Sequence, residues 1–340
     1  MNNKKFEKLA GLVGHTPLIR IDYSFMGKQR SVFAKVEFVN LTGSIKDRMT
    51  FYILKQAYLR GEIKEGDTIV EATSGNTGIS FAAMGAYLGN PVVIYMPDWM
   101  SIERKNLISS YGAEIRLVSR EEGGFLGCIA KTEELKRCNQ NIYLPRQFEN
   151  GDNILSHTST IAPEVWMQLE SICLQPDIAV AGVGTGGTVM GFCEYFKSLR
   201  NDISVHPLEP LSSPTLSTGH CRGSHRIQGI SDEFIPSILN KDKLDEIIAV
   251  DDGDSIIIAQ MLASKLGLGV GISSGSNLIG AIMLKERYPD ATVVTVFADD
   301  NKKYISTDYG RKEPKKDGFI SSSIEFSGFE TMQFTNVSST

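Results

Sequence analysis

The sequence predicts an α/β protein of two domains, each with a mostly parallel, twisted sheet, and with a cleft between the domains. Short apolar segments typical of strands alternate with segments of helical periodicity, and this alternation is typical of parallel sheets covered by helices. Residues 91–96 form a continuous apolar run, as expected for a strand buried on both faces. The chain has 340 residues, 41% of them hydrophobic, which suffices for about two cores.

In the first half of the chain, strands are predicted from apolar alternation or short apolar runs, and helices from a repeating apolar face. The strands are expected at residues 17–21, 32–38, 67–72, 91–96 and 114–117. The helices are expected at residues 47–59, 79–88, 101–111 and 128–137. Met49 and Ile53 share a face of the first helix, Gly89 ends the second, and Ser101 is the N-cap of the third.

The second half repeats the alternation after a loop at residues 145–153. Strands are expected at residues 178–183, 204–208, 247–250 and 292–297. Helices are expected at residues 163–171, 188–199 and 254–266, and a long loop at 210–226. The segment from about residue 311 is basic and then rich in Ser and Thr without a clear period, so we expect a loosely held tail.

Composition excludes several classes of function. The net charge of −5 argues against a nucleic-acid surface. The five cysteines have no C-x-x-C pair and no zinc-like spacing, so we expect reduced thiols and no metal. The first residues show no signal peptide, and no apolar run is long enough to span a membrane. These features predict a soluble, cytoplasmic protein.

Residues 40–48, Asn-Leu-Thr-Gly-Ser-Ile-Lys-Asp-Arg, place Lys46 behind a Gly-Ser turn at the start of a predicted helix. The positive end of the helix dipole there would help to keep an amine neutral. Loops rich in Gly, Ser and Thr occur also at 73–78, 184–188 and 271–277, each after an apolar run and before a helical pattern. Together these segments predict one pocket for a small anionic cofactor, although a lone lysine at a helix start is more often a surface residue.

The loop at residues 184–188, Gly-Thr-Gly-Gly-Thr, allows three interpretations. Its backbone N–H groups and hydroxyls could hold a phosphate at a helix N-terminus. It also belongs to a G-x-G-x-x-G pattern, with Glu209 ending the next strand, as in dinucleotide-binding folds. The third interpretation is an ordinary strand-to-helix turn. Lys46 favours the phosphate, because an imine-forming cofactor requires a neutral amine and a nicotinamide enzyme does not.

The remaining two loops predict a substrate site and a contact to the cofactor ring. Residues 73–78, Thr-Ser-Gly-Asn-Thr-Gly, offer hydroxyls and free N–H groups that suit a substrate carboxylate. In residues 271–277, a serine hydroxyl facing a pyridine nitrogen would leave that nitrogen unprotonated, which suits β-elimination better than transamination. Each loop could also be an ordinary helix cap.

In this order and spacing, the four motifs resemble the cysteine synthase and cystathionine β-synthase family of fold-type II pyridoxal-phosphate enzymes. The resemblance runs from about residue 8 to residue 310. It extends to Gly14-His15-Thr16-Pro17-Leu18, Met96-Pro97, Met100-Ser101, Glu103-Arg104, Gln147-Phe148 and Pro163-Glu164-Val165-Trp166.

The resemblance implies a role for each motif residue. Lys46 would carry pyridoxal 5'-phosphate as an imine and remove the Cα proton, and Asn76 would bond the 3-oxygen of the cofactor. Ser273 would meet the ring nitrogen. The phosphate would be held by Gly184, Thr185, Gly186, Gly187 and Thr188. The substrate carboxylate would be held by Thr73, Ser74, Gly75, Thr77 and Gln147.

The resemblance also implies how the chain is divided and assembled. Two three-layer α/β domains would enclose the active site in their cleft, and the protein would be a homodimer. Residues 41–155 would form an N-terminal domain with a mobile part that closes over the substrate. Residues 1–40 and 156–312 would form the domain with the phosphate loop, and residues 313–340 a tail.

Two departures from the family pattern stand out. Leu41 replaces the usual Pro, which would change loop stiffness only. Ser231, Asp232 and Glu233 replace small residues of a Gly-Ile-Gly-Ala-Gly-Phe segment beside the reacting β-carbon. The hypothesis is that Asp232 points into the cleft, repels hydrosulfide and activates water.

The predicted reaction converts L-cysteine and water into L-serine and hydrogen sulfide, with water adding to the aminoacrylate. Ser74 would assist at the leaving sulfur. In the alternative, Asp232 and Glu233 face solvent or cap a turn, and the protein makes L-cysteine from O-acetylserine and sulfide or uses another nucleophile. A nicotinamide oxidoreductase and a binding-only relative are the alternatives from other classes.

Overall fold

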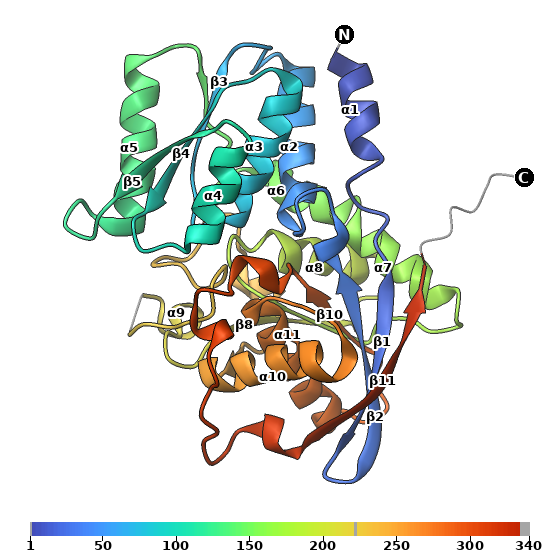
Figure 1. Ribbon diagram of the computed structural model, residues 1–340. Coiled ribbons are helices and arrows are strands. Elements are labelled where there is room, and N and C mark those ends of the chain that lie inside the picture. Colours follow the sequence, from blue (N-terminus) through green and yellow to red (C-terminus); the bar gives the residue numbers. More distant parts are fainter. Residues whose placement is uncertain (1, 221–222, 334–340) are drawn as a thin grey trace, which may run out of the picture.

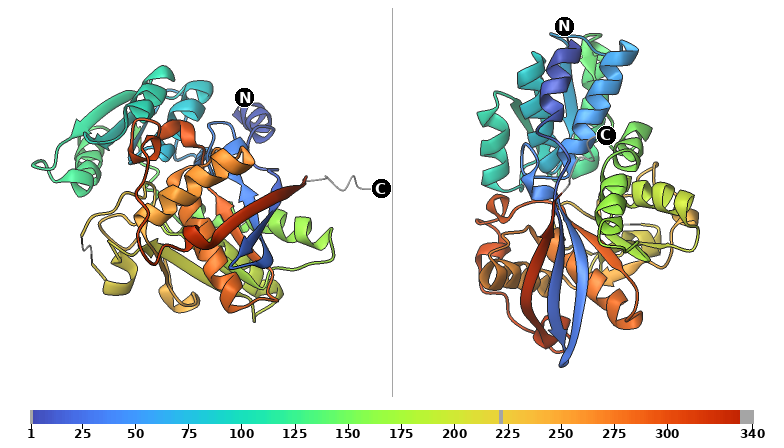
Figure 2. Two further views of the ribbon diagram at one scale, coloured as in Figure 1. Left: turned by 60° about the horizontal axis from the view of Figure 1, so that its bottom comes forward. Right: turned by 90° about the vertical axis from the view of Figure 1, so that its right-hand side faces the viewer.

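The computed structural model describes residues 2–220 and 223–333, and two sheets organise this part of the chain (Figure 1). One sheet has four parallel strands in the order β5-β4-β3-β6. The other has seven strands in the order β11-β1-β2-β10-β7-β8-β9, parallel from β2 to β9. Helices flank both sheets, which confirms the predicted α/β class with mostly parallel sheets (Figure 2).

The four-stranded sheet lies between two apolar cores. Its strands are β3 (Thr68–Ala72), β4 (Val92–Pro97), β5 (Glu114–Val118) and β6 (Ile142–Tyr143). The helices around it are α1 (Asn2–Ala10), α2 (Lys46–Arg60), α3 (Asn76–Leu88), α4 (Ile102–Ser110) and α5 (Gly124–Cys138). Successive strand residues point to opposite faces, so Ile69 and Ile94 enter the core shared with α2 and α3, whereas Val70 and Val93 enter the core shared with α5.

The seven-stranded sheet is built in the same way. Its strands are β1 (Leu18–Phe25), β2 (Lys28–Val36), β7 (Ile178–Gly182), β8 (Ser204–Pro210), β9 (Ile248–Val250), β10 (Val293–Phe297) and β11 (Ile324–Met332). The α-helices are α6 (Gly151–Thr158), α7 (Ile161–Glu170), α8 (Gly187–Leu199), α9 (Thr215–Thr218), α10 (Asp252–Leu266) and α11 (Ile272–Arg287). Val180 packs with α10 and α11 on one face, and Ala179 packs with α7 and α8 on the other.

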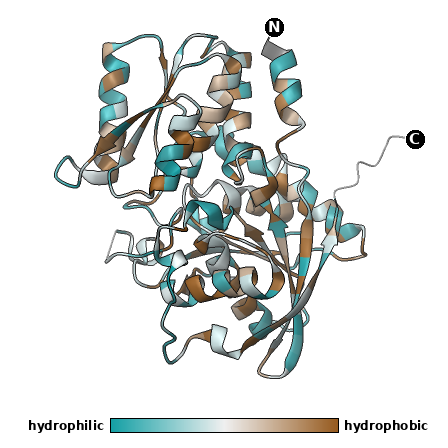
Figure 3. Cartoon of the chain, in the orientation of Figure 1, coloured by the Kyte–Doolittle hydropathy of each residue, from teal (hydrophilic) through white to brown (hydrophobic). Residues whose placement is uncertain are grey.

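Short 3₁₀ helices complete the described chain. They are η1 (Glu37–Val39), η2 (Lys241–Lys243), η3 (Asn301–Lys303), η4 (Asp308–Gly310) and η5 (Ile320–Ser323). Hydrophobic residues concentrate along the strands and the helices beside them (Figure 3). Among the described helices, none is both long and apolar enough to cross a membrane.

The predicted loosely held tail is wrong for its described part, because β11 pairs antiparallel with β1 along the edge of the larger sheet (Figure 2). The register runs from Leu18 opposite Met332 to Phe25 opposite Ile324 and shifts between Asp22 and Tyr23. This bulge adds an unpaired residue to β11 and breaks the alternation of apolar residues. The strand therefore has no continuous period in its sequence. Residues 334–340 of the predicted tail lie outside the described residues.

Three further segments differ from prediction. Helix α1 packs on α2 and α3 through Phe6 and Leu9, so residues 2–10 lie with the four-stranded sheet and not with the larger one. Helix α6 begins inside the loop predicted at 145–153, and α11 begins at Ile272, so the last motif forms helical turns. The other predicted domain boundaries stay predictions.

Candidate active site

The motif residues predicted to act together line one cavity between the two sheets. They come from the start of α2, the β3–α3 and β7–α8 junctions, the start of α11, and the segments before α6 and after α9. The predicted residues that line it are Lys46, Thr73, Ser74, Asn76, Thr77, Gln147, Gly184, Thr185, Gly186, Gly187, Thr188, Asp232 and Ser273. The motifs at residues 73–78 and 184–188 lie at the carboxyl ends of the parallel strands β3 and β7, where ligands bind in open α/β folds.

Lys46 is the first residue of α2, at the predicted helix N-terminus, and its side chain enters the cavity. Desolvation lowers the pKa of its amine, and the charges of Asp232 and Asp299 oppose that shift. No ion pair to Lys46 occurs in the described part of the chain. Desolvation therefore favours the neutral amine, which a nucleophile and base requires.

Buried polar contacts fix the first turn of α2. Asp47 accepts hydrogen bonds from the Thr42 N–H and hydroxyl, both at 2.7 Å. The guanidinium of Arg48 donates to Glu37 at 2.6 Å and to Glu164 at 2.7 Å. These contacts tie α2 to η1 and α7, and removing one partner of such a buried pair would leave an uncompensated charge. Asp47 and Arg48, the two residues that follow Lys46, thus hold its backbone in place.

The loop at residues 184–188 packs closely against neighbouring chain segments, and only glycine fits at two of its positions. A Cβ on Gly184 would lie 2.5 Å from the carbonyl oxygen of Gly229, and a Cβ on Gly187 would overlap the side chain of Asn153. Asn153 also donates to the Thr185 hydroxyl at 2.9 Å. The loop opens α8, so the free N–H groups of the first helical turn face the cavity, as a phosphate requires.

Glu209 does not support the dinucleotide interpretation of this loop. Its carboxylate is buried at the end of β8 and accepts hydrogen bonds from the Leu216 N–H at 2.7 Å and from the Ser217 hydroxyl. Both donors belong to the following segment of the chain. The carboxylate that would bind a ribose in a dinucleotide-binding fold therefore already accepts hydrogen bonds from the protein itself.

The loop between β3 and α3 is held by its own hydrogen bonds. The Thr73 hydroxyl accepts from the Gly75 N–H at 3.1 Å. The Thr77 hydroxyl donates to the Gln147 side chain at 2.7 Å, and the Gln147 amide donates to the carbonyl of Ala72 at 2.9 Å. This arrangement presents the first N–H groups of α3 and the hydroxyl of Ser74 to the cavity, which suits a carboxylate.

Several polar groups of the cavity lack partners among the described residues, and two of them suit a cofactor ring. Asn76 donates to Asp299 at 2.8 Å, but its buried Oδ1 has no partner there. The Ser273 hydroxyl, in the first turn of α11, lines the cavity and makes no hydrogen bond to another described residue. Unpaired polar atoms in a buried site are typical of a ligand-binding site. A flat, polar ring with a phosphate, held between Asn76, Ser273 and the glycine loop, fits these donors and acceptors.

Asp232 lines the same cavity as Lys46, as predicted from the sequence. Burial raises the pKa of its carboxyl to about 6, and the charge of Lys46 opposes the shift. Among the described residues, none donates a hydrogen bond to this carboxylate. Glu233 is exposed. The two acids of the segment therefore differ, and only Asp232 faces the site.

Comparison with known proteins assigns the family. A family model described as "Pyridoxal-phosphate dependent enzyme" matches residues 9–299. Cysteine synthase B of Campylobacter jejuni is 43% identical over 305 residues, which cover 90% of this chain and 99% of the relative. The chain belongs to the cysteine synthase family of pyridoxal-phosphate dependent enzymes.

Solved structures agree with this family. A hydrogen sulfide-producing enzyme from Fusobacterium nucleatum is 55% identical, with a TM-score of 0.95 over 97% of this chain and 99% of that chain. The D232N mutant of that enzyme, in complex with an alpha-aminoacrylate intermediate, is 56% identical, with a TM-score of 0.93 over 95% of this chain and 97% of that chain.

Membership of the cysteine synthase family fixes the class of chemistry. The protein is an enzyme whose cofactor is pyridoxal phosphate, and it performs β-replacement or β-elimination on a small-molecule substrate. The interpretation as a nicotinamide enzyme is therefore wrong, and so is the binding-only alternative. The roles of the individual site residues stay predictions.

Sequence reasoning gave Arg104 no role, although it matches a family motif. Arg104 is 2% exposed and lines the cavity. Its guanidinium lies 4.7 Å from the centroid of the Tyr304 ring and donates to Gln228. Gly75 does not line the cavity but leaves room for this side chain, because a Cβ at position 75 would overlap Arg104. Only the folded chain brings these positions together.

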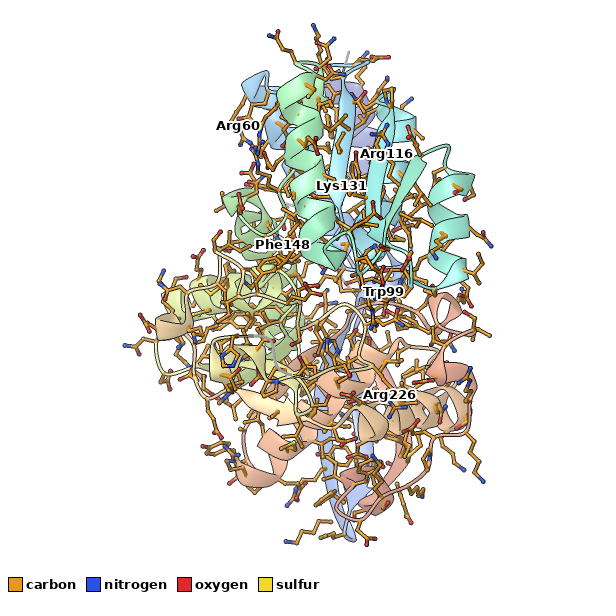
Figure 4. All side chains as sticks on the ribbon, turned by 90° about the vertical axis from the view of Figure 1, so that its left-hand side faces the viewer. Arg60, Trp99, Arg116, Lys131, Phe148 and Arg226 are labelled. Carbon is orange, nitrogen blue, oxygen red and sulfur yellow. The ribbon has the colours of Figure 1, made fainter. Side chains whose placement is uncertain are left out.

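An aromatic cluster at the junction between the four-stranded and the seven-stranded sheet, with their flanking helices, was also not predicted. The ring of Phe148 lies 5.6 Å from that of Phe125 and 5.0 Å from that of Phe234, measured between centroids. Phe148 and Trp99 both lie at this junction in Figure 4. Phe125 and Phe148 line the cavity beside Asp232 and are apolar, so they limit the access of water on that side.

Proposed function

We propose that this enzyme converts L-cysteine and water into L-serine and hydrogen sulfide. The observation that carries the proposal is the carboxylate of Asp232, which lines the cavity of Lys46 at a position where the family pattern has a small residue. The similarity to the hydrogen sulfide-producing enzyme, at 55% identity, exceeds the 43% identity to cysteine synthase B and supports the same direction.

The reaction exchanges one bond at the β-carbon. The C–S bond of cysteine breaks and a C–O bond to water forms; the sulfur leaves with its proton and gains another, as hydrogen sulfide. Pyridoxal phosphate, when bound, supplies the electron sink that makes the Cα proton acidic and lets the β-substituent leave. In this proposal it is held by Lys46, Asn76, Ser273 and the loop at residues 184–188.

Each remaining step is assigned to a group of the chain. The N–H groups at Ser74 and Thr77 and the hydroxyl of Thr73, with Gln147 behind them, bind and orient the substrate carboxylate. Lys46 takes the proton from Cα. The Ser74 hydroxyl stands beside the leaving sulfur and can donate a hydrogen bond to it.

Asp232 acts on the water. A carboxyl with a pKa of about 6 is mostly ionised at neutral pH, yet it is basic enough to accept a proton from water as the C–O bond forms. The same negative charge repels hydrosulfide, so water competes better with hydrosulfide for the β-carbon. The proposal therefore assigns both the activation of water and the choice of nucleophile to this side chain.

The test follows the oxygen atom. With cysteine in ¹⁸O-labelled water, the wild-type enzyme should release sulfide and form serine that carries one ¹⁸O in its side chain. Asp232→Asn should retain sulfide release in a first turnover and lose serine formation. Equal rates of labelled serine formation in both proteins would remove Asp232 from the chemistry.

The second candidate function is synthesis of L-cysteine from O-acetylserine and sulfide. It is favoured by the relatives named cysteine synthase, among them a probable cysteine synthase of Bacillus subtilis that is 42% identical over 300 residues. Product analysis with cysteine, serine and O-acetylserine as separate donors distinguishes the two. We also propose a homodimer, to be checked by light scattering.

A further inference from the structure

Ser231, the residue before Asp232, has an unusual backbone. Its φ angle is 55°, in the left-handed region that residues with a Cβ rarely occupy. Small residues fill this segment in the family pattern, and glycine adopts such angles freely. A serine here is held in a disfavoured conformation, and such conformations persist only where the surroundings fix them.

Hydrogen bonds to every polar group of Ser231 fix this conformation. Its N–H donates to the carbonyl of Val183 at 2.7 Å, directly before the glycine loop. Its hydroxyl donates to the carbonyl of Ser213 at 2.9 Å. Its own carbonyl lies 2.9 Å from Nε2 of His225. The peptide groups on both sides of Ser231, including the one shared with Asp232, are therefore held in place.

The contact with His225 also defines the state of its imidazole. A carbonyl oxygen can only accept, so Nε2 must carry the hydrogen. The Nδ1 atom of His225 is buried and has no partner among the described residues. His225, Ser231 and Asp232 line one outer chamber, which also contains Ser74. The ring therefore lies against the segment that carries Asp232.

We propose that Ser231 and His225 are positioning residues that aim the Asp232 carboxylate at the water. This inference rests on the proposed function. The hydrogen bonds of the Ser231 N–H and carbonyl orient the backbone that leads into Asp232, and the side chain of Asp232 faces the cavity of Lys46. Neither positioning residue is assigned contact with the substrate.

The inference predicts a change in product rather than a loss of all activity. Sulfide release does not need Asp232, so it continues when Asp232 is misdirected. Without addition of water to the β-carbon, the remaining fragment is hydrolysed to pyruvate and ammonia. Cysteine plus water then gives pyruvate, ammonia and hydrogen sulfide, which balances. The ratio of serine to pyruvate thus reports how well Asp232 is aimed.

The experiment measures this ratio in the full-length enzyme with pyridoxal phosphate bound. Ser231→Ala keeps the Cβ but removes the hydroxyl, and His225→Leu removes the donor; each should lower the serine-to-pyruvate ratio about tenfold, the factor that one lost buried hydrogen bond corresponds to. His225→Gln keeps an N–H donor and should restore the ratio to within about twofold of wild type. Ser198→Ala, an exposed position on α8, is the matched control.

A second measurement does not depend on activity. In ¹⁵N-histidine-labelled wild-type protein, which has five histidines, the signal assigned with His225→Gln should show hydrogen on Nε2. The opposite tautomer would overturn the proposal. Unchanged ratios in both Ser231→Ala and His225→Leu would do the same.

Asp232→Asn, measured in parallel, distinguishes failure of the proposed function from failure of the positioning role of Ser231 and His225. If Asp232→Asn forms serine as fast as wild type, the proposed function fails. If Asp232→Asn loses serine while Ser231→Ala and His225→Leu keep the wild-type ratio, only the positioning role fails.

Discussion

The substrate loop at residues 73–77 and the segment at residues 228–233 border the same cavity but are held in different ways. The substrate loop begins a helix, and its own residues together with Gln147 satisfy it. The other segment belongs to no described helix or strand and includes a serine with a φ angle of 55°. The substrate loop is suited to binding the carboxylate that all amino-acid substrates carry. The segment at residues 228–233 is suited to selecting the nucleophile that reacts. Changes in the two regions should therefore have separable effects on binding and on product.

The largest effect is expected at Lys46, which serves both regions. Lys46→Ala removes the amine that holds the cofactor and takes the proton, so sulfide and serine should both fall by about 10⁴-fold or more. The visible absorbance of the bound cofactor should change as well. Lys55→Ala, on the exposed side of the same helix, should leave both unchanged. Retained turnover in Lys46→Ala would contradict the assignment.

Asp232→Asn should lower serine formation only, and by a smaller factor than Lys46→Ala. We expect serine formation to fall about 10²-fold, because a general base contributes roughly that factor, while KM for cysteine stays near wild type. In the wild type, serine formation should rise as pH increases through about 6, because the raised pKa keeps Asp232 protonated below that value. The pH profile of Asp232→Asn should lack this rise; an unchanged profile would assign it to another group.

Gly75→Ala tests the contact that links the two regions. The added Cβ would overlap Arg104, whose guanidinium reaches Gln228 at the start of the second segment. We expect a loss of about 2 kcal/mol in the free energy of unfolding, measured with urea, together with lower activity. Gly151→Ala is the control, since its Cβ would meet no atom within 4 Å. Similar stability of both variants would show that Arg104 can move aside.

The smallest effect is expected at Thr77, in the substrate loop. Thr77→Val removes the hydroxyl that donates to Gln147, so the loop should bind carboxylate less well and KM for cysteine should rise about tenfold. The serine-to-pyruvate ratio should not change. A changed ratio with a normal KM would mean that the two regions are not separable.

Much of this site could be predicted from the sequence, because glycine, serine and threonine after a strand indicate a loop that can bind an anion. The loop at residues 184–188 is an example, and Lys46 lines the same cavity. The backbone of Ser231 was not visible, since its positive φ depends on hydrogen bonds to Val183 and Ser213, which are distant in the chain. Arg104 was missed for the same reason: its partner Tyr304 is supplied by the other sheet unit.

The fold divides in the same way. Strands buried on both faces, such as β4 and β7, were predicted close to their observed limits because every residue of the run is apolar. β11 was missed because its bulge interrupts the period of 2. Helix α1 was missed because only two of its residues, Phe6 and Leu9, belong to the apolar core on which it packs.

The pairing of β11 with β1 has a consequence for synthesis on the ribosome. Leu18 is made early, but its partner Met332 emerges more than 300 residues later. Until then the β1 edge of the nascent sheet is open to pairing with other chains. Contacts between such distant positions form slowly, so this edge is exposed to aggregation until the last strand is added.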